Sequence, residues 1–209
     1  IETACRGVPI VLCDRTVHNY SLDVVTSDHE TGMRMLIQHL KGKGYTRPIL
    51  FTQSWDQNST RMRRRKSFIQ AVEEIYGYTP KFQKDIFLID HSEGISTVSQ
   101  LKLMQNGDIP AVIGTNSITT ARVYHGISEL GMSMPNEIGL CGPEDWDWSN
   151  ELNWPFMIRP HVTTLKVPST EIGYRAAQRL LEKMQHPDTQ PKEISLPCIL
   201  NARESTELR

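Results

Sequence analysis

The chain has 209 residues, a length that suits one large domain or two small lobes with separate cores. Its 23 Lys and Arg residues nearly balance its 24 Asp and Glu residues, whereas a nucleic-acid-binding domain normally carries a basic excess. The four cysteines are widely spaced and form no C-x-x-C pair, which argues for a reducing compartment and against a zinc site. No signal peptide opens the sequence, and no apolar run approaches the ~18 residues of a membrane span. We therefore expect a cytoplasmic globular segment without metal or cofactor that does not itself bind DNA.

Short apolar runs of strand type alternate with longer amphipathic segments along the chain. In chain order, the pattern predicts a strand at 8–13, a helix at 28–43, a strand at 47–52, a helix at 59–75, a strand at 86–89, a helix at 95–104, a strand at 111–114, a helix at 118–130, strands at 138–141 and 162–165, a helix at 170–184 and a strand at 192–200. Gly44 is expected to end the first of these helices. Alternation with short connections predicts right-handed β-α-β units and mostly parallel sheets, an α/β fold.

In parallel sheets, ligands bind beyond the carboxyl ends of the strands. The positions of interest are therefore those that follow Cys13, Thr52, Ile89, Gly114 and Cys141. An enzyme on such a fold would show the same alternation, and Asp14, His91 and Glu144 can be grouped on paper as acid–base machinery. The sequence, however, contains no G-x-S-x-G elbow, no phosphate-binding glycine loop and no H-E-x-x-H motif. We therefore expect a binding protein and not an enzyme.

Several short segments, in order and over nearly the whole chain, resemble the effector-binding domain of LacI-family transcription regulators. They are GVPIVLCDR at 7–15, SDHETG at 27–32, STRMRRRKSF at 59–68, AVIGTN at 111–116, GPED at 142–145, VTT at 162–164 and EIGYRAA at 171–177. Sugar-binding proteins of transport systems share that fold and are the alternative. The ending LPCILNAREST at 196–206 resembles the tail of the regulators, and this favours a regulator.

The resemblance implies a periplasmic-binding-protein-like fold of two Rossmann-like lobes with parallel sheets and a three-stranded hinge. The N-terminal lobe is expected to comprise 1–54 and 166–190, and the C-terminal lobe 55–165 and 191–209. Crossings between the lobes are expected near 53–55, 163–166 and 190–192. Compared with the family, the first lobe is incomplete, since its first three strands and the DNA-binding helix-turn-helix are absent from this chain.

Three polar side chains match the ligand-gripping positions of the family. Arg64 matches an arginine whose rigid fork of donors suits paired hydroxyls or a carboxylate. Asn116 matches an amide that both donates and accepts, although it can also cap the helix that follows it. Glu144 stands where the family usually has Asp, so its reach is one methylene longer, and Asp145 is an alternative after a small loop shift. Truncation of Arg64 is expected to abolish binding and to leave the melting temperature largely intact.

Five further residues complete the expected ligand site. Asp14 is placed as a contact from the first lobe, Thr60 as a hydroxyl contributor, and His91 where relatives present an aromatic ring. Trp146 is expected to edge the cleft, with Trp148 and Trp154 as alternatives. Arg61 is expected beside Arg64, although charge runs of this kind are usually solvated helix faces.

The implied function is to bind a small-molecule effector, a sugar or sugar acid, between the lobes. The stretch STRMRR resembles the branch that includes regulators of 2-keto-3-deoxygluconate use, which favours an acidic sugar over a neutral one. Binding would favour the closed arrangement and so change how a homodimer presents a helix-turn-helix to operator DNA.

Overall fold

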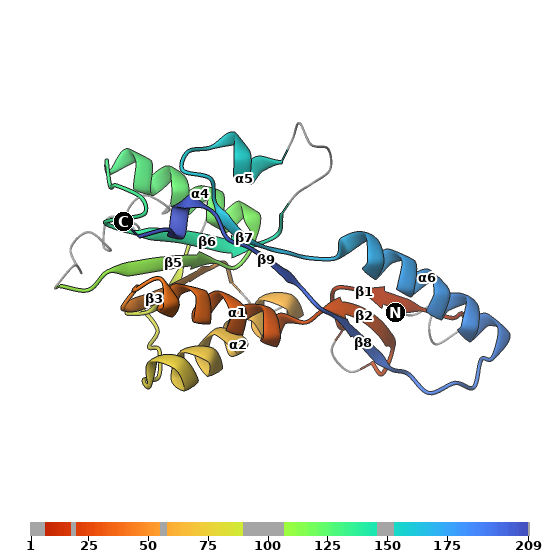
Figure 1. Ribbon diagram of the computed structural model, residues 1–209. Helices are drawn as coiled ribbons and strands as arrows, with labels where there is room; N and C mark the ends of the chain where they lie inside the picture. The colour runs from red at the N-terminus through yellow and green to blue at the C-terminus, as the bar shows by residue number, and fades with distance from the viewer. Residues whose placement is uncertain (1–6, 18–19, 55–57, 90–106, 146–152, 209) are drawn as a thin grey trace.

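The described part of the chain forms two β-sheets with helices packed on them, and three of its segments pass between the sheets (Figure 1). The computed structural model describes residues 7–17, 20–54, 58–89, 107–145 and 153–208. The smaller sheet has the order β1 (Val11–Cys13), β2 (Asp23–Ser27), β8 (Glu193–Leu196), all parallel. The larger has the order β4 (Ile86–Leu88), β3 (Arg47–Thr52), β5 (Pro110–Gly114), β6 (Gly139–Pro143), β7 (Thr163–Lys166), β9 (Ile199–Asn201), and β9 alone among these runs antiparallel.

The larger sheet is buried on both faces, as the continuous apolar runs of its strands predict. In β3, Leu50 packs into one core cluster with helices α1 (His29–Gly42) and α2 (Ser59–Tyr76). Its neighbours Ile49 and Phe51 point the other way, toward a second cluster with helix α4 (Ser117–Glu129). Successive side chains of a strand alternate between faces, so one strand supplies both cores. The prediction of a mostly parallel α/β fold is confirmed.

Helix α1 shows how the local sequence sets the boundaries of a helix. The Asp28 side chain accepts a hydrogen bond from the Thr31 N–H at 2.9 Å, which satisfies a donor of the first turn. The apolar stripe of the helix is fully buried and consists of Met33, Leu36, Ile37 and Leu40. Gly44 takes a φ of 90°, a left-handed conformation that suits glycine and ends the helix as expected.

The smaller sheet is covered on one face by helix α6 (Ser169–Gln185) and is anchored by a buried ion-pair cluster. Asp23 is fully buried and accepts from Arg179 Nε at 2.6 Å, Lys183 Nζ at 2.7 Å and the Lys192 N–H at 3.0 Å. Burial alone would raise the pKa of Asp23, but the bonds from Lys183 and Arg179 lower it on balance. The cluster ties α6, and the loop that follows it, to the first residue of β2.

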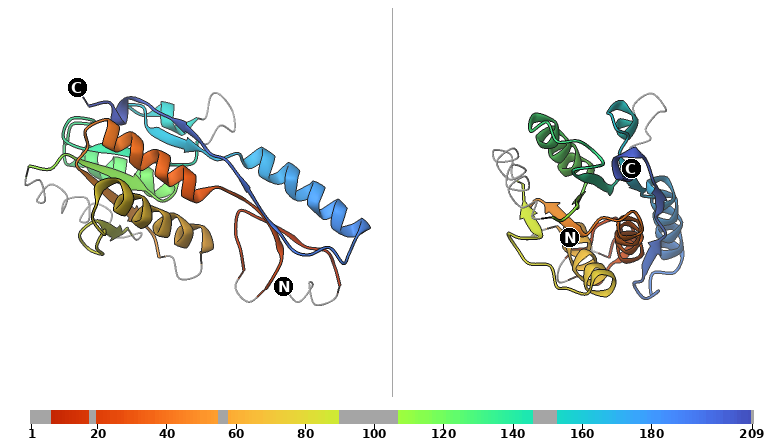
Figure 2. Two further views of the ribbon diagram at one scale, coloured as in Figure 1. Left: turned by 60° about the horizontal axis from the view of Figure 1, so that its bottom comes forward. Right: turned by 60° about the vertical axis from the view of Figure 1, so that its left-hand side comes forward.

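The chain passes between the sheets at Asp28, at 167–168 and at 197–198 (Figure 2). Three crossings were predicted, but the positions 53–55 and 190–192 are wrong. Helix α1 and strand β3 lie with the larger sheet and not with the first lobe, and β8 lies with the smaller sheet. The reason is strand pairing, since β3 bonds to β4 and β5, whereas β8 bonds to β2. No helix in the described ranges is long and apolar enough to cross a membrane.

The other predicted elements lie within a few residues of the observed ones, with three exceptions. Strand β2 occupies a stretch expected to be a loop. The single strand expected at 192–200 is two strands that belong to different sheets. The helix expected at 95–104 falls outside the described residues. A short helix α5 (Trp154–Met157) and a 3-10 turn η2 (Glu204–Thr206) complete the fold.

Candidate functional site

Polar side chains gather where the strands of both sheets end. Strand β1 ends at Cys13 and is followed by Asp14, and β3, β5 and β6 end next to Gln53, Thr115 and Glu144. The first turn of α2 lies among these strand ends, as its hydrogen bonds to Asp14 and Thr115 show. We call this group the strand-end cluster. It consists of Asp14, Gln53, Thr60, Arg61, Arg64, Thr115, Asn116, Ser117 and Glu144.

Arg64 is the most buried cation of the strand-end cluster, with 4% of its surface exposed. Its Nη1 donates to the Thr115 carbonyl at 2.6 Å and to Glu144 Oε1 at 2.9 Å. The other carboxylate oxygen of Glu144 accepts from Ser117, from the N–H at 3.2 Å and the hydroxyl at 3.0 Å. The guanidinium and the carboxylate thus hold each other in fixed orientations across the ends of β5 and β6.

Arg61 and Asn116 both donate hydrogen bonds to the side chain of Gln53. Gln53 Oε1 accepts from Arg61 Nη2 at 2.6 Å and from Asn116 Nδ2 at 3.3 Å. Asn116 also caps α4, because its Oδ1 accepts from the Thr119 N–H at 2.8 Å. The capping role considered for Asn116 is therefore real, and its amide nitrogen at the same time faces the cluster.

Asp14 joins the smaller sheet to this group. Thr60 Oγ1 donates to the Asp14 carbonyl at 3.1 Å and lies 3.4 Å from its Oδ2, while the Asp14 N–H still bonds to the Val25 carbonyl. Asp14 Oδ1 is buried and has no hydrogen-bond partner among the described residues. A buried carboxylate oxygen without a donor is costly unless a ligand or water supplies one.

Two acidic residues of the cluster have left-handed backbone conformations. Asp14 has a φ of 64° and Glu144 a φ of 79°, both directly after a strand. Such conformations cost non-glycine residues roughly 1–3 kcal/mol and are concentrated at functional sites. Here they turn the chain at the strand ends while each N–H keeps its bond to the neighbouring strand.

Most of the residues expected in the ligand site lie together in the structure. They are Asp14, Thr60, Arg61, Arg64, Asn116 and Glu144. Asp145, the alternative to Glu144, does not join them: it binds Arg203 with both oxygens. His91 and Trp146 fall outside the described residues. Trp154 lies at the edge of the cluster, where its Nε1 donates to the Glu144 carbonyl at 3.3 Å.

Sequence reasoning missed Gln53 and Ser117, which respectively link Arg61 to Asn116 and fix the Glu144 carboxylate. The strand-end rule contained a signal for Gln53, because that residue follows the predicted end of a strand. No sequence signal distinguished Ser117 from the other hydroxyl residues of its helix.

His29 is a buried titratable group next to the strand-end cluster. Its ring nitrogens lie 3.3 Å from Ser27 Oγ and 3.5 Å from Thr26 Oγ1, and Thr26 in turn donates to the Asp14 carbonyl. Burial, together with the charges of Arg64 and Arg63, lowers the pKa of His29 to about 3. The imidazole is therefore neutral at physiological pH.

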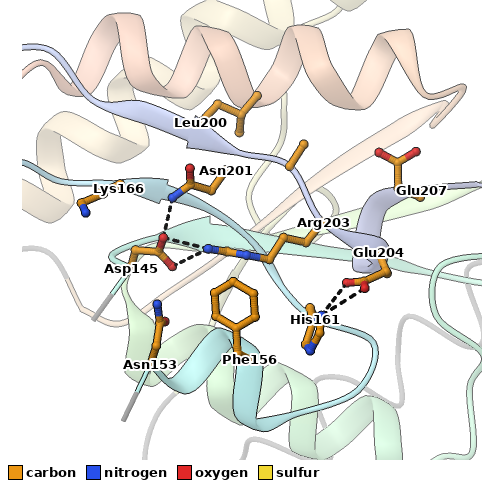
Figure 3. Close-up of a pocket in the computed structure, with 11 residues that line it drawn as sticks. Asp145, Asn153, Phe156, His161, Lys166, Leu200, Asn201, Arg203, Glu204 and Glu207 are labelled. Atoms are coloured by element: carbon orange, nitrogen blue, oxygen red, sulfur yellow. Dashed lines mark hydrogen bonds and ion pairs between the residues drawn. The ribbon is translucent and has the colours of Figure 1, made fainter. Parts of the chain in front are cut away.

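A cavity of about 870 Å³ lies elsewhere, between α5 and the strands β7 and β9 (Figure 3). The carboxylate of Asp145 faces it but is already bound by Arg203, Asn201 and Thr164. Arg203 also donates to the Val162 carbonyl, and its guanidinium carbon lies 4.5 Å from the centre of the Phe156 ring. These bonds fasten the last strand to its neighbours. We regard the strand-end cluster as the better candidate, because it joins both sheets and contains Asp14 Oδ1, which no described residue supplies with a donor.

Comparison with known proteins identifies the family and the fold of the chain. Residues 37–206 match the periplasmic binding protein-like domain. The chain is similar to the HTH-type transcriptional regulator KdgR of Bacillus subtilis, with 25% identity over 96% of this chain and 57% of that protein. It is also similar to the HTH-type transcriptional regulator PtxS of Pseudomonas aeruginosa, with 26% identity over 98% and 57%. The chain thus spans less than two thirds of the length of these relatives.

A solved structure shows the same fold. It is a LacI family transcriptional regulator from Enterococcus faecium with bound ribose, which matches with a TM-score of 0.75 and 23% identity over 97% of this chain and 72% of that one.

Proposed function

The chain belongs to the periplasmic binding protein-like domain family, and from that premise we propose that it is the ligand-sensing part of a LacI-type transcription regulator. The observation that carries the proposal is the strand-end cluster, in which polar groups from both sheets meet at the edge where α/β sheets bind ligands. The two relatives named above, KdgR and PtxS, are HTH-type transcriptional regulators. In the longer protein, a helix-turn-helix would bind operator DNA as part of a cytoplasmic homodimer.

The charges of the cluster suit a ligand with many hydroxyl groups. Arg61 and Arg64 supply two positive charges, and Asp14 and Glu144 supply two negative ones. Asn116 adds an amide that both donates and accepts. Neighbouring hydroxyls of a sugar can donate to a carboxylate and accept from a guanidinium, and Asp14 Oδ1 needs such a donor. A sugar acid would also fit, because its carboxylate can replace Glu144 as the partner of Arg64.

The two lobes that would close on the ligand follow the sheets. We assign residues 7–27 and 167–196 to the first lobe, and residues 28–166 and 197–208 to the second. Asp14 belongs to the first, and the rest of the cluster to the second. A ligand that binds both would favour the closed arrangement to the extent that it binds that arrangement more tightly. Closure would then change how the DNA-binding heads of a dimer are presented.

Calorimetric titration with a panel of neutral sugars and sugar acids tests the proposal. We expect one member of the panel to bind and the variant Asn116→Asp to weaken that binding about tenfold, because Asp keeps the cap of α4 but loses the amide donor. Asp28→Asn is the matched control, since Asp28 caps α1 outside the cluster. Binding of a purine or an amino acid in place of any sugar would overturn the ligand class. Unchanged affinity in Asn116→Asp would overturn the site.

The alternative function is that of a sugar receptor of a transport system, which has the same fold. The gene sequence upstream of Ile1 separates the two: a helix-turn-helix supports the regulator, and an export signal supports the receptor.

A further inference from the structure

Helix α2 belongs to the larger sheet but contacts the smaller lobe through three residues of its first two turns. Ser59 Oγ accepts from the Thr16 N–H at 2.9 Å, and Thr60 binds Asp14 as described above. Arg63 forms a two-pronged ion pair with Glu193, in which Nη2 lies 2.8 Å from Oε2 and Nη1 contacts Oε1. Glu193 is the first residue of β8, which pairs with β2 in the smaller sheet.

We propose that the Arg63–Glu193 ion pair is an interlobe latch, which favours the closed arrangement of the lobes and thereby sets ligand affinity without touching the ligand. The effect on affinity rests on the function proposed above. The effect on the distance between the lobes does not, since it concerns the protein without ligand.

The latch is separate from the strand-end cluster although Arg63 and Arg64 are adjacent in sequence. Adjacent residues on a helix point about 100° apart. Arg64 is therefore buried against the ends of β5 and β6, whereas Arg63 reaches the smaller sheet. The side chains of Arg63 and Glu193 are 34% and 42% exposed, so the pair lies at the rim of the contact between the lobes. Opening the lobes must break the pair, because Arg63 and Glu193 belong to different lobes.

The electrostatic surroundings favour the intact pair. The hydrogen bond from Arg63 lowers the pKa of Glu193, and the same bond raises the pKa of Arg63, which the charge of Asp14 also favours. Asp14 belongs to the same lobe as Glu193, so both acidic groups draw Arg63, and the helix that carries it, toward the smaller sheet.

The chain offers a matched control pair. Arg34 of α1 and Glu74 of α2 also form a two-pronged ion pair, with side chains 38% and 49% exposed. Both belong to the same lobe, so the lobes can open without breaking this pair. Loss of either pair should affect folding stability to a similar, small degree, because exposed ion pairs contribute little to stability. Only loss of the latch should affect lobe arrangement and ligand affinity.

The experiment measures the distance between the lobes and the ligand affinity in the same variants. Spin labels are attached through non-canonical amino acids at Ser128 of α4 and Met184 of α6, both exposed and in different lobes. The distance distribution is recorded without ligand for the parent protein, Arg63→Ala and Arg34→Ala. Affinity is then measured by calorimetry with the sugar or sugar acid that binds the parent.

We expect Arg63→Ala to shift the distance distribution toward longer values and to weaken binding by roughly two- to fivefold. Arg34→Ala should change neither. Arg63→Glu should shift the distribution and weaken binding at least as much as Arg63→Ala, because it places an acidic group near Glu193 and Asp14. Adding Glu193→Arg to it should return both the distribution and the affinity toward the parent values, because the swapped pair can form again. An unchanged distance distribution in Arg63→Ala, or no restoration in the swapped pair, overturns the latch. If no sugar binds the parent, the proposed function fails, and the distance measurement still decides on the latch.

Discussion

The buried position of Arg64 changes what its truncation should do. Arg64→Ala removes the donor to the Thr115 carbonyl and to Glu144 Oε1. Hydrogen bonds that involve a charged group contribute about 1.5–3 kcal/mol each, and leaving a buried carboxylate unpaired adds a further cost. Glu144 keeps its two bonds from Ser117, and 27% of its side chain is exposed, so water replaces part of the loss.

We therefore expect Arg64→Ala to lower the free energy of unfolding by about 3 kcal/mol. For a chain of this size, that corresponds to a fall in Tm of roughly 6–12 °C. The sequence alone predicted a melting temperature left largely intact, because an arginine lining an open cleft has no internal partners to lose. Urea unfolding followed by tryptophan fluorescence measures the change.

The control is Arg175→Ala, which removes an exposed ion pair with Glu171 on one face of α6. It should cost less than about 0.5 kcal/mol. If Arg64→Ala costs no more than this control, the two hydrogen bonds do not hold the cluster together, and the reasoning fails. If Arg64→Ala is destabilised but still binds the effector with parent affinity, Arg64 is a structural residue and not a ligand contact.

Three further outcomes follow from buried groups. His29 has a pKa of about 3 in the folded chain against about 6.5 when unfolded. The unfolded state therefore takes up a proton first as the pH falls, and the folded state loses stability. His29→Gln should reduce this loss between pH 7 and pH 5 by up to about 2 kcal/mol, as measured by urea titrations at the two pH values. Asp23→Asn should cost about 3–5 kcal/mol by the same assay, because two basic side chains of α6 lose a buried partner, and a cost under 1 kcal/mol would contradict this. Gly139→Ala should lower Tm, since the new methyl group would lie 2.6–2.8 Å from side-chain atoms of Tyr45. Gly173→Ala is the control: its methyl group meets no atom within 4 Å, and it should raise Tm by strengthening α6.

Much of the candidate site could be predicted because the strand-end rule and the family resemblance point to the same positions. Asp14, Arg64 and Glu144 lie far apart in the sequence, but Asp14 and Glu144 each follow the carboxyl end of a parallel strand, and α2 brings Arg64 to the same strand ends. What the sequence could not supply is how these groups bind one another. Gln53 is an ordinary loop residue until Arg61 and Asn116 reach it from two other elements.

Most strands of the larger sheet were predicted, although β3 was assigned to the wrong lobe, whereas the smaller sheet was predicted only in part. The central strand of the smaller sheet, β2, begins with Asp23 and ends with Thr26 and Ser27, so its sequence resembles a polar loop. All five of its residues are nevertheless buried, since Asp23 is neutralised by basic residues more than 150 positions away. The two strands at the end of the chain were merged because nothing in an apolar run tells which sheet it joins. Pairing over long distances decides both cases.

On the function and the latch proposed above, helix α2 would couple ligand binding to the arrangement of the lobes. Its Arg64 lies in the strand-end cluster and its Arg63 contacts the smaller sheet, so a rotation of the helix changes both contacts together. A ligand bound to Asp14 and Arg64 would pull on the same two bodies that the latch holds together. The ligand and the latch should therefore both favour the closed arrangement. With a stronger latch, a smaller population remains open before the ligand binds, so the ligand can shift the equilibrium less. On this reasoning, the latch sets the balance between affinity for the effector and the size of the response to it.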